Sequence, residues 1–451
     1  MLPGGLPKTV MKLVTQNFQL TTRVALALVT CGWASSLGAT SPAIESSSAA
    51  RYFADAREIA DKDGGKLWGR SIIGPLLFVD PVTREVVASS ADREQQLEAL
   101  DGIYFGTLPA NVLIANTAVD WAGVRWTMLM WPLPEDPVRR RILLAHELWH
   151  HLQDELGFPS SGAANSHLDT REGRIWLQLE WRALAEPLSR KGAERQEASA
   201  DALLFRAYRC SLFAKAEEEE RAMEMHEGLA EYTGVALSGA PNPAGFVAGH
   251  NLKEAASKPT FVRSFAYASG PAYGILLDQT GKDWRRQLKK TDDLGELLRT
   301  TLSIPIPKDL KQAVERRAAN YGGDALVASE NERAERRAKL LAIYRQKFIE
   351  GPVLAIPLQQ MKMQFDPGEL ISLEPRGTVY PNIKIIDNWG TLTVSQGALM
   401  ETDFSKVTVP APAETKGATV KSDGWLLELN PGWELKAGAR RGDWTAVKVS
   451  P

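Results

Sequence analysis

Hydrophobic and polar positions between residues 72 and 133 follow the pattern of short strands joined by turns. Runs rich in β-branched and aromatic residues are bounded there by Gly, Pro and Asp. Strands are expected at 75–79, 85–88, 103–106, 111–115 and 124–131. Residues 120–123, with the sequence Asp-Trp-Ala-Gly, predict the hairpin turn between the last two strands. A short helix is expected before this stretch, at 50–59.

From Asp136 to about Phe348 the apolar positions recur at helical spacing instead. Helices are expected near 137–156, 172–188, 192–213, 216–237, 263–279, 283–300 and 323–350. The many charges between Glu330 and Lys339 indicate that the last of these helices is solvated. The rest of the chain returns to short strands between closely spaced turn residues, which predicts a small β-sandwich or barrel.

These patterns together predict an α+β fold, in which a β-sheet is followed by a helical bundle and then by a small all-β domain. The expected boundaries are 1–43 for a signal peptide and linker, 44–135 for a mainly β part, 136–350 for a helical part, and 351–451 for the C-terminal β domain. A chain of 451 residues is long enough for this organisation.

The N-terminal residues have the order of a secretory signal peptide. Basic residues, the last of them Arg23, precede a short apolar run at 24–30, and small residues follow it. The protein is therefore expected to be exported, to the periplasm or the extracellular side of a bacterial envelope. The apolar run is too short to cross a bilayer, so no transmembrane span is expected. Residues 28–31 weakly resemble a bacterial lipobox, which leaves a lipid anchor at Cys31 as an alternative, and a tail without a targeting role as another.

Composition narrows the chemistry that the chain can carry. The formal net charge is -2, which gives no reason to expect nucleic acid or an anionic membrane surface as a partner. The two cysteines, Cys31 and Cys210, are too few for a disulfide framework or a cysteine-based zinc site. No histidine follows His250, so metal binding by imidazole is confined to the helical part.

Residues 146–150, with the sequence His-Glu-Leu-Trp-His, form an H-E-x-x-H motif. The flanking residues predict that the motif lies on a helix. Asp136 is placed as the N-cap, Pro137 stands in the first turn, and Gly157 provides a stop.

Helical spacing gives this motif its chemistry. His146 and His150 are four residues apart and so share one face of the helix, from which both imidazoles can bind a single Zn²⁺. Glu147 is expected to act as the general base, taking a proton from the metal-activated water and passing it to the leaving amine. The alternative is a helix that carries two surface histidines and a solvated glutamate.

A catalytic zinc site needs a third protein ligand, and no later histidine has the metzincin spacing, so a carboxylate is expected. Three candidates remain open: Glu227, Glu197 and Glu180. Glu227 and Glu231 lie at positions i and i+4, with a glycine between them that allows a second helix to approach closely. For Glu197 and Glu180 the simpler interpretation is a charge on the solvated face of an amphipathic helix.

Residues 226–234, His-Glu-Gly-Leu-Ala-Glu-Tyr-Thr-Gly, resemble the N-E-G-F-A segment of gluzincin aminopeptidases and the E-x-x-x-D helix of thermolysin-like enzymes. The resemblance implies that Glu227 is the third zinc ligand and that Glu231 hydrogen-bonds a ligating histidine. His226 departs from the family pattern by replacing its asparagine. The segment 197–201 resembles instead the E-x-x-A-D segment of Ste24-type zinc peptidases.

A tyrosine further along the chain extends the resemblance. Residues 265–277 are similar to the Y-x-x-G segment of gluzincin aminopeptidases, and Tyr267 matches its tyrosine. The resemblance implies that Tyr267 donates a hydrogen bond to the developing oxyanion, and a phenol with a pKa of about 10 is protonated at neutral pH. The alternative is a tyrosine that packs one helix on another.

The resemblance covers about residues 110–300 and implies a gluzincin-type catalytic domain with one Zn²⁺ per chain, in which a sheet edge aligns an extended peptide or protein substrate. It implies a zinc metallopeptidase. A G-x-M-E-N segment is lacking, so both endopeptidase and exopeptidase action stay open. The competing hypotheses are a non-catalytic envelope protein with structural or no zinc, and a zinc hydrolase of a non-peptide amide or ester.

Overall fold

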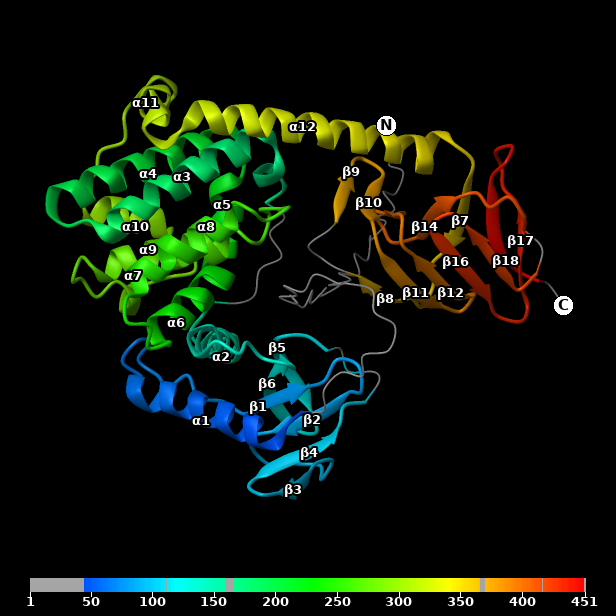
Figure 1. Cartoon of the computed structure of the whole chain (residues 1–451), viewed down its shortest axis with the longest axis horizontal. Coiled ribbons are helices and arrows are strands. Elements are labelled where there is room, and N and C mark those ends of the chain that lie inside the picture. Colours follow the sequence, from blue (N-terminus) through cyan, green and yellow to red (C-terminus); the bar gives the residue numbers. More distant parts are fainter. Residues whose placement is uncertain are drawn as a thin grey trace, which may run out of the picture.

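The computed structural model describes residues 44–109, 112, 114–158, 165–365, 370–415 and 417–449. The expected signal peptide and the lipid-anchor candidate Cys31 lie outside these residues. The described chain is mixed α+β, with an N-terminal sheet, a helical region and C-terminal β-sheets. Figure 1 shows the long helix α12 (Gly323–Arg345) running from the helical region to the C-terminal sheets.

The N-terminal sheet has six strands in the order β3-β4-β2-β1-β6-β5. Its strands are β1 (Leu76–Val79), β2 (Glu85–Ala88), β3 (Glu98–Leu100), β4 (Ile103–Thr107), β5 (Thr117–Trp121) and β6 (Val124–Met130). β1 pairs in parallel with β6, and the other neighbouring strands pair antiparallel. Helices α1 (Ser46–Asp63) and α2 (Pro137–Leu152) pack against the same face, where the ring of Phe53 stacks on that of Phe78 with centroids 4.5 Å apart. The motif helix therefore rests directly on the sheet.

The hairpin expected at 120–123 is present, but the strand before it is shifted. Ala122 and Gly123 form the turn with φ of 50° and 73°, the left-handed conformations that tight hairpins use. β5 begins at Thr117, and the described residues within 111–115 are not in a strand. The side chain of Asn116 explains the difference, because its Oδ1 accepts the N–H of Met130 at 2.8 Å and replaces a backbone ladder bond.

Helix α2 begins where the capping residues predict. The Asp136 carboxylate accepts the N–H of Arg139 at 2.8 Å, and Pro137 occupies the first turn. The helix ends at Leu152, earlier than expected, and turns lead from there to Gly157, which has φ of 85°. The two histidines of the motif thus lie in the last turns of the helix.

The other expected helices are present with changed bounds. They are α3 (Arg171–Ser189), α4 (Gly192–Leu212), α5 (Ala216–Met223), α6 (Leu229–Leu237), α9 (Ala266–Asp278) and α10 (Leu294–Thr301). A π-helical turn, η2 (Glu224–Gly228), joins α5 to α6. α10 begins later than the expected 283–300 because Asp293 starts a new helix by accepting the N–H of Glu296. Three short helices were not expected: α7 (Pro243–Phe246), α8 (Leu252–Ala255) and α11 (Leu310–Ala318).

Glycines let α6 and η2 sit close to two other helices at once. A Cβ atom on Gly270 of α9 would lie 2.3 Å from the Cα of Gly228, and a Cβ on Gly234 would lie 2.7 Å from the carbonyl oxygen of Ile142 on α2. Neither contact can be relieved by a side-chain movement, because both partners are backbone atoms. The segment that carries Glu227 is therefore held between α2 and α9.

The C-terminal strands form two sheets that share one core, as a β-sandwich does. The first sheet has the order β17-β18-β7-β14-β13-β10-β9, with β7 (Val353–Pro357), β9 (Ile371–Leu373), β10 (Gly377–Tyr380), β13 (Ala398–Glu401), β14 (Lys406–Pro410), β17 (Trp433–Ala437) and β18 (Trp444–Lys448). The second has the order β15-β16-β12-β11-β8, with β8 (Lys362–Phe365), β11 (Ile383–Asp387), β12 (Gly390–Val394), β15 (Thr419–Ser422) and β16 (Trp425–Leu429).

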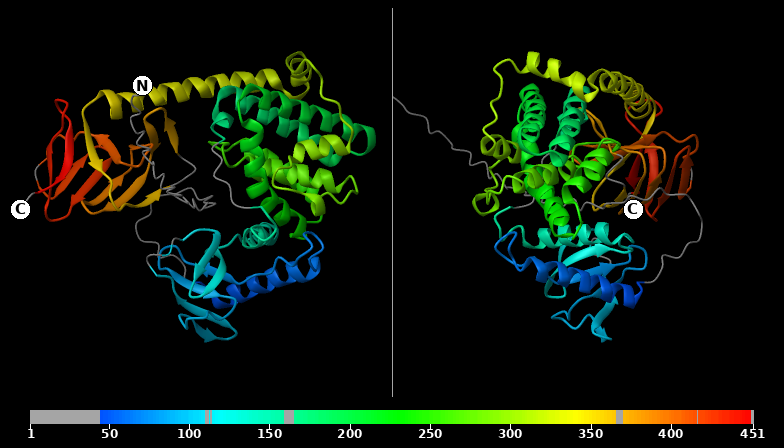
Figure 2. Two further views of the ribbon diagram at one scale, coloured as in Figure 1. Left: turned by 180° about the vertical axis from the view of Figure 1, so that it is seen from behind. Right: turned by 60° about the vertical axis from the view of Figure 1, so that its left-hand side comes forward.

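The sandwich lies away from the N-terminal sheet in all three views of Figures 1 and 2, and α12 joins it to the helical region. Most of α12 is solvated as expected, but Glu330 is buried against Arg174, with Nε 3.1 Å from the carboxylate. At the other end, Phe348 packs into a small core with Val379 and Leu399. Among the described residues no helix is both long enough and apolar enough to cross a membrane.

Candidate metal centre

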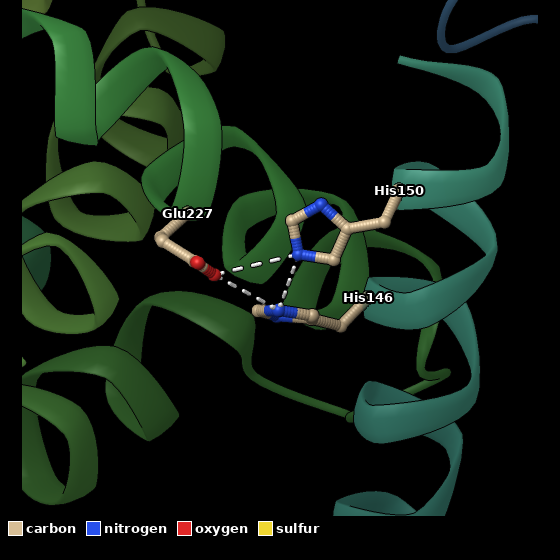
Figure 3. A group of neighbouring side chains, drawn as sticks. All are labelled: His146, His150 and Glu227. Carbon is tan, nitrogen blue, oxygen red and sulfur yellow. Dashed lines mark hydrogen bonds and ion pairs between the residues drawn. The ribbon is translucent and has the colours of Figure 1, made fainter. Parts of the chain in front are cut away.

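Three side chains bring their ligand atoms together between α2 and η2 (Figure 3). The Nε2 atoms of His146 and His150 are 3.1 Å apart. Glu227 Oε2 lies 3.5 Å from the first and 3.4 Å from the second. Within the described ranges, His146, His150 and Glu227 are the group of histidine and carboxylate side chains that could hold a metal ion.

The dimensions of this triangle fit a tetrahedral zinc ion. Tetrahedral coordination with bonds of about 2.0–2.1 Å places neighbouring ligand atoms about 3.3 Å apart. The three measured separations, from 3.1 to 3.5 Å, bracket that value. Three protein ligands also leave one coordination position for water or substrate, which distinguishes catalytic from structural zinc sites.

The outer nitrogens of both imidazoles have acceptors that define the tautomer. His146 Nδ1 is 3.0 Å from Glu231 Oε2, and His150 Nδ1 is 2.7 Å from Gln153 Oε1. When both imidazoles are neutral, a proton on each Nδ1 satisfies these acceptors and leaves a lone pair on each Nε2. Two lone pairs and a carboxylate oxygen then face one another at close range. Such a donor set calls for a cation.

The pKa of His146 also indicates that this cluster favours a positive charge. Burial by itself would lower this pKa, but hydrogen bonds to Glu227 and Glu231 and the field of Glu147 outweigh the burial and raise the pKa to about 10. Burial would likewise raise the pKa of Glu227, yet its contacts with the two ligand histidines hold that pKa well below its usual range. The cluster is therefore strongly biased toward binding positive charge.

Glu147 lies in the same electrostatic environment but is not part of the triangle. Its side chain is almost fully enclosed, the residue being 3% exposed, and Oε2 has no hydrogen-bond partner among the described residues. Burial, the largest effect, raises its pKa, while His146 and His150 lower it. Glu147 is thus a buried acceptor with a raised pKa beside the candidate metal site, a combination that is common among residues that take up protons.

Tyr267 also reaches the site. Its hydroxyl donates to Glu227 Oε2 at 2.6 Å, and its ring is stacked on the ring of His146 with centroids 5.4 Å apart. Burial and the neighbouring carboxylate raise the pKa of Tyr267 well above its ordinary value, so the phenol keeps its proton. The hydroxyl therefore lies directly beside the candidate metal ligands.

The two other carboxylates considered as third ligand lie elsewhere. Glu197 is on the surface of α4 with a side chain 72% exposed, in agreement with the solvated-face interpretation. For Glu180 that interpretation is wrong. Its side chain is 0% exposed and is bound by Arg209 and by the hydroxyl of Tyr273. A buried arginine, invisible to the local pattern, compensates the charge of Glu180.

Three residues of the site were not found from the sequence. Gln153 accepts the Nδ1–H of His150 and could have been found, because it lies three residues after His150, at the C-cap of α2. Asn251, at the end of the π-helical turn η3 (Val247–Asn251), donates from Nδ2 to Glu231 Oε1 and to the Tyr267 carbonyl, each at 3.0 Å. Arg263 donates to Glu227 Oε1 at 3.0 Å. Tertiary packing brings the last two to the site, and no local signal marks them.

Neither a family model, nor a curated protein, nor a solved structure is similar to this chain at a significant level. The interpretation of the site consequently rests on its own geometry and on the motifs of the sequence.

Proposed function

We propose that this protein is a zinc-dependent peptidase with a gluzincin-type catalytic site. The observation that carries the proposal is the triangle of His146 Nε2, His150 Nε2 and Glu227 Oε2, whose edges of 3.1–3.5 Å fit tetrahedral zinc. Glu147 and Tyr267 stand beside the triangle as a proton acceptor and a hydrogen-bond donor.

Zinc bound at this site would supply a Lewis acid and an activated water. The residues of the chain have separate tasks around it. Glu147 accepts the proton of the attacking water and returns it to the leaving nitrogen. Tyr267 donates a hydrogen bond to the carbonyl oxygen as that oxygen gains charge. Glu231 and Gln153 hold the Nδ1 protons of the two ligand histidines, which keeps both Nε2 atoms available.

The N-terminal sheet offers a place for an extended substrate. Among the described residues, β5 is an edge strand that pairs with β6 on one side only, and it contacts the motif helix α2. A peptide chain can add to such an edge through main-chain hydrogen bonds. This arrangement favours a peptide over other amides, because the edge binds a backbone rather than a particular side chain.

A non-catalytic zinc protein fits the site less well. Structural zinc sites are closed by four protein ligands, whereas the triangle has three. A structural site also has no need of Glu147, whose buried Oε2 has no hydrogen-bond partner among the described residues and so costs stability. The basic and apolar leader of the sequence supports an exported enzyme, in the periplasm or outside the cell.

The test is to measure zinc per chain by elemental analysis, followed by peptide hydrolysis. We expect one zinc in the wild-type protein and its loss in His146→Ala and Glu227→Ala. Glu197→Ala, a glutamate change on the surface, is the matched control and keeps its zinc. Glu147→Gln keeps zinc and loses hydrolysis of a quenched-fluorescent peptide library. A folded wild-type protein that takes up no zinc, or zinc-loaded protein that cleaves no peptide, contradicts the proposal.

A further inference from the structure

Arg263 stands on the far side of the third ligand from the two histidines. Glu227 turns its Oε2 to the histidines and to Tyr267, while its Oε1 accepts from Arg263 Nη2 at 3.0 Å. A single carboxylate thus separates the guanidinium from the proposed metal. Arg263 lies just before α9 with a side chain 25% exposed, so that the group borders the site without being sealed in the core.

The guanidinium of Arg263 is only partly paired within the described residues. In the described part of the chain, Glu227 is the ionic partner of Arg263, through one oxygen, and the buried Nε has no hydrogen bond. Two buried arginines of the helical core are matched far better. Arg206 binds both oxygens of Glu224 and also Asp293, and Arg209 binds two carboxylates in the same way. Compared with these two, Arg263 keeps an unpaired donor.

The charge of Arg263 is also poorly compensated. Glu227 is shared with two imidazoles and a phenol, and under the proposed function it serves a metal ion as well. His226 adds a second polar group on this side, since its Nδ1 lies 3.5 Å from Glu227 Oε1 and has no hydrogen bond. A guanidinium in this state binds a carboxylate well, because its planar donors match both oxygens.

We propose that Arg263, with His226 beside it, binds a substrate carboxylate close to the scissile bond. This inference rests on the proposed function and names its substrate class. Glu227 Oε2 faces the proposed metal while Oε1 accepts from Arg263 at 3.0 Å, so the guanidinium is within reach of the residues that adjoin the scissile bond, since one residue spans about 3.8 Å of chain. The carboxylate therefore belongs to a residue next to the scissile bond, as a free C-terminus or as an Asp or Glu side chain.

A purely structural role for Arg263 predicts something different. Holding Glu227 needs one Nη contact and makes no distinction between acidic and neutral substrates. Carboxylate binding instead predicts a preference for acidic over neutral substrates, and this preference requires the paired N–H donors of the guanidinium. The two roles are separated by ligand charge, which can be changed without any change in the protein.

Binding is measured by isothermal titration calorimetry on the full chain carrying Glu147→Gln, loaded with zinc so that peptides bind without turnover. The probes are acetyl-alanyl-alanyl-phenylalanine, its C-terminal amide, and acetyl-alanyl-alanyl-glutamic acid α-amide. We expect one or both acids to bind about 10- to 100-fold tighter than the neutral amide, the range for a charge-assisted hydrogen-bonded pair. Arg263→Gln removes this preference, Arg263→Lys retains part of it, and the exposed-arginine control Arg286→Gln retains all of it.

Zinc content is measured in every variant, because Arg263 also contacts a metal ligand. The acid that binds more tightly shows whether the bound carboxylate is a C-terminus or a side chain. Equal binding of all three peptides overturns the inference, as does no binding at all. A preference that persists in zinc-loaded Arg263→Gln also overturns it, since the carboxylate would then ligate the metal directly.

The test of the carboxylate site can fail or succeed independently of the test of the proposed peptidase function. Turnover of the same peptides by the wild-type protein tests peptidase action, whereas calorimetry tests the carboxylate site. Cleavage of acid and amide with equal efficiency, together with equal binding, removes the inference and leaves the peptidase standing. Tight, Arg263-dependent binding without cleavage supports the carboxylate site and removes the peptidase.

Discussion

Replacing Gly270 by alanine tests whether a helix contact sets the geometry of the proposed metal centre. The new Cβ would lie 2.3 Å from the Cα of Gly228, 2.6 Å from its carbonyl carbon and 2.7 Å from its carbonyl oxygen. All three are backbone atoms, so α9 and η2 must move apart. Glu227 precedes Gly228 directly, and Tyr267 lies one helical turn before Gly270. Separating the helices therefore displaces two groups of the site at once.

The magnitude follows from the cost of overpacking, about 1–3 kcal/mol. Alanine would gain up to about 1 kcal/mol of helix propensity over glycine, which hides part of that cost. Gly249→Ala is the control for this gain in helix propensity, because Gly249 also lies in a helical turn and its Cβ would meet no atom within 4 Å. We expect the unfolding free energy of Gly270→Ala to be lower than that of Gly249→Ala by about 1–3 kcal/mol.

The assay is urea denaturation of both variants without metal, followed by zinc titration against a chelator. Gly270→Ala is expected to bind zinc about 10- to 100-fold more weakly than Gly249→Ala, a loss typical of disturbed support around metal ligands. If the two variants unfold at the same urea concentration and bind zinc equally, the contact between Gly228 and Gly270 does not position Glu227, and the reasoning fails.

Three other changes test the supporting residues. Asn251→Ala removes the donor to Glu231 and should weaken zinc binding about 10-fold in the chelator competition, while the fold measured by circular dichroism is retained. Burial raises the pKa of Glu220, but Arg209 and His167 outweigh it and hold that pKa well below its usual range. Glu220 therefore stabilises the folded state at any pH above its unfolded-state pKa of about 4.3. This stability is lost as the pH falls further, toward the lower pKa of the folded state. Urea unfolding at stepped pH should then show a shallower decline below the unfolded-state pKa in Glu220→Gln than in wild type. Arg209→Met leaves buried carboxylates unpaired and should lower the unfolding free energy by about 3–5 kcal/mol, a loss that thermal and urea denaturation would both record; a change below about 1 kcal/mol contradicts the ionic role assigned to it.

Local signals predicted the elements whose ends are fixed by neighbouring residues. Asp136 and Pro137 define the start of α2, and Ala122 with Gly123 defines the hairpin turn. The start of β5 could not be predicted, because it depends on the side chain of Asn116, which takes over a backbone bond of β6. The sequence shows the spacing of apolar residues and the capping residues. It does not show contacts between distant segments, and these decide where a strand such as β5 begins.

The same distinction between local signals and contacts of distant segments applies to the residues of the candidate site. The two histidines follow from helix geometry alone, because a spacing of four residues places them on one face. Glu227 was one of three open alternatives, and the choice depends on how α6 and η2 dock on α2. Glu180 shows the limit most clearly, since its burial is possible only with Arg209, which lies on another helix. The roles given to these residues stay predictions until zinc and activity are measured.

The position of Glu227 depends on a buried ionic network behind it. Glu224, three residues earlier in η2, is bound through both oxygens by Arg206 of α4, which also binds Asp293 at the start of α10. A π-helical turn spans the interval from Glu224 to Gly228, and such turns change the direction of the side chains that follow. One end of the turn is therefore fixed by charge and the other by the glycine contact with α9. Between these two constraints Glu227 has little freedom, which is the condition that the proposed zinc site would place on a ligand.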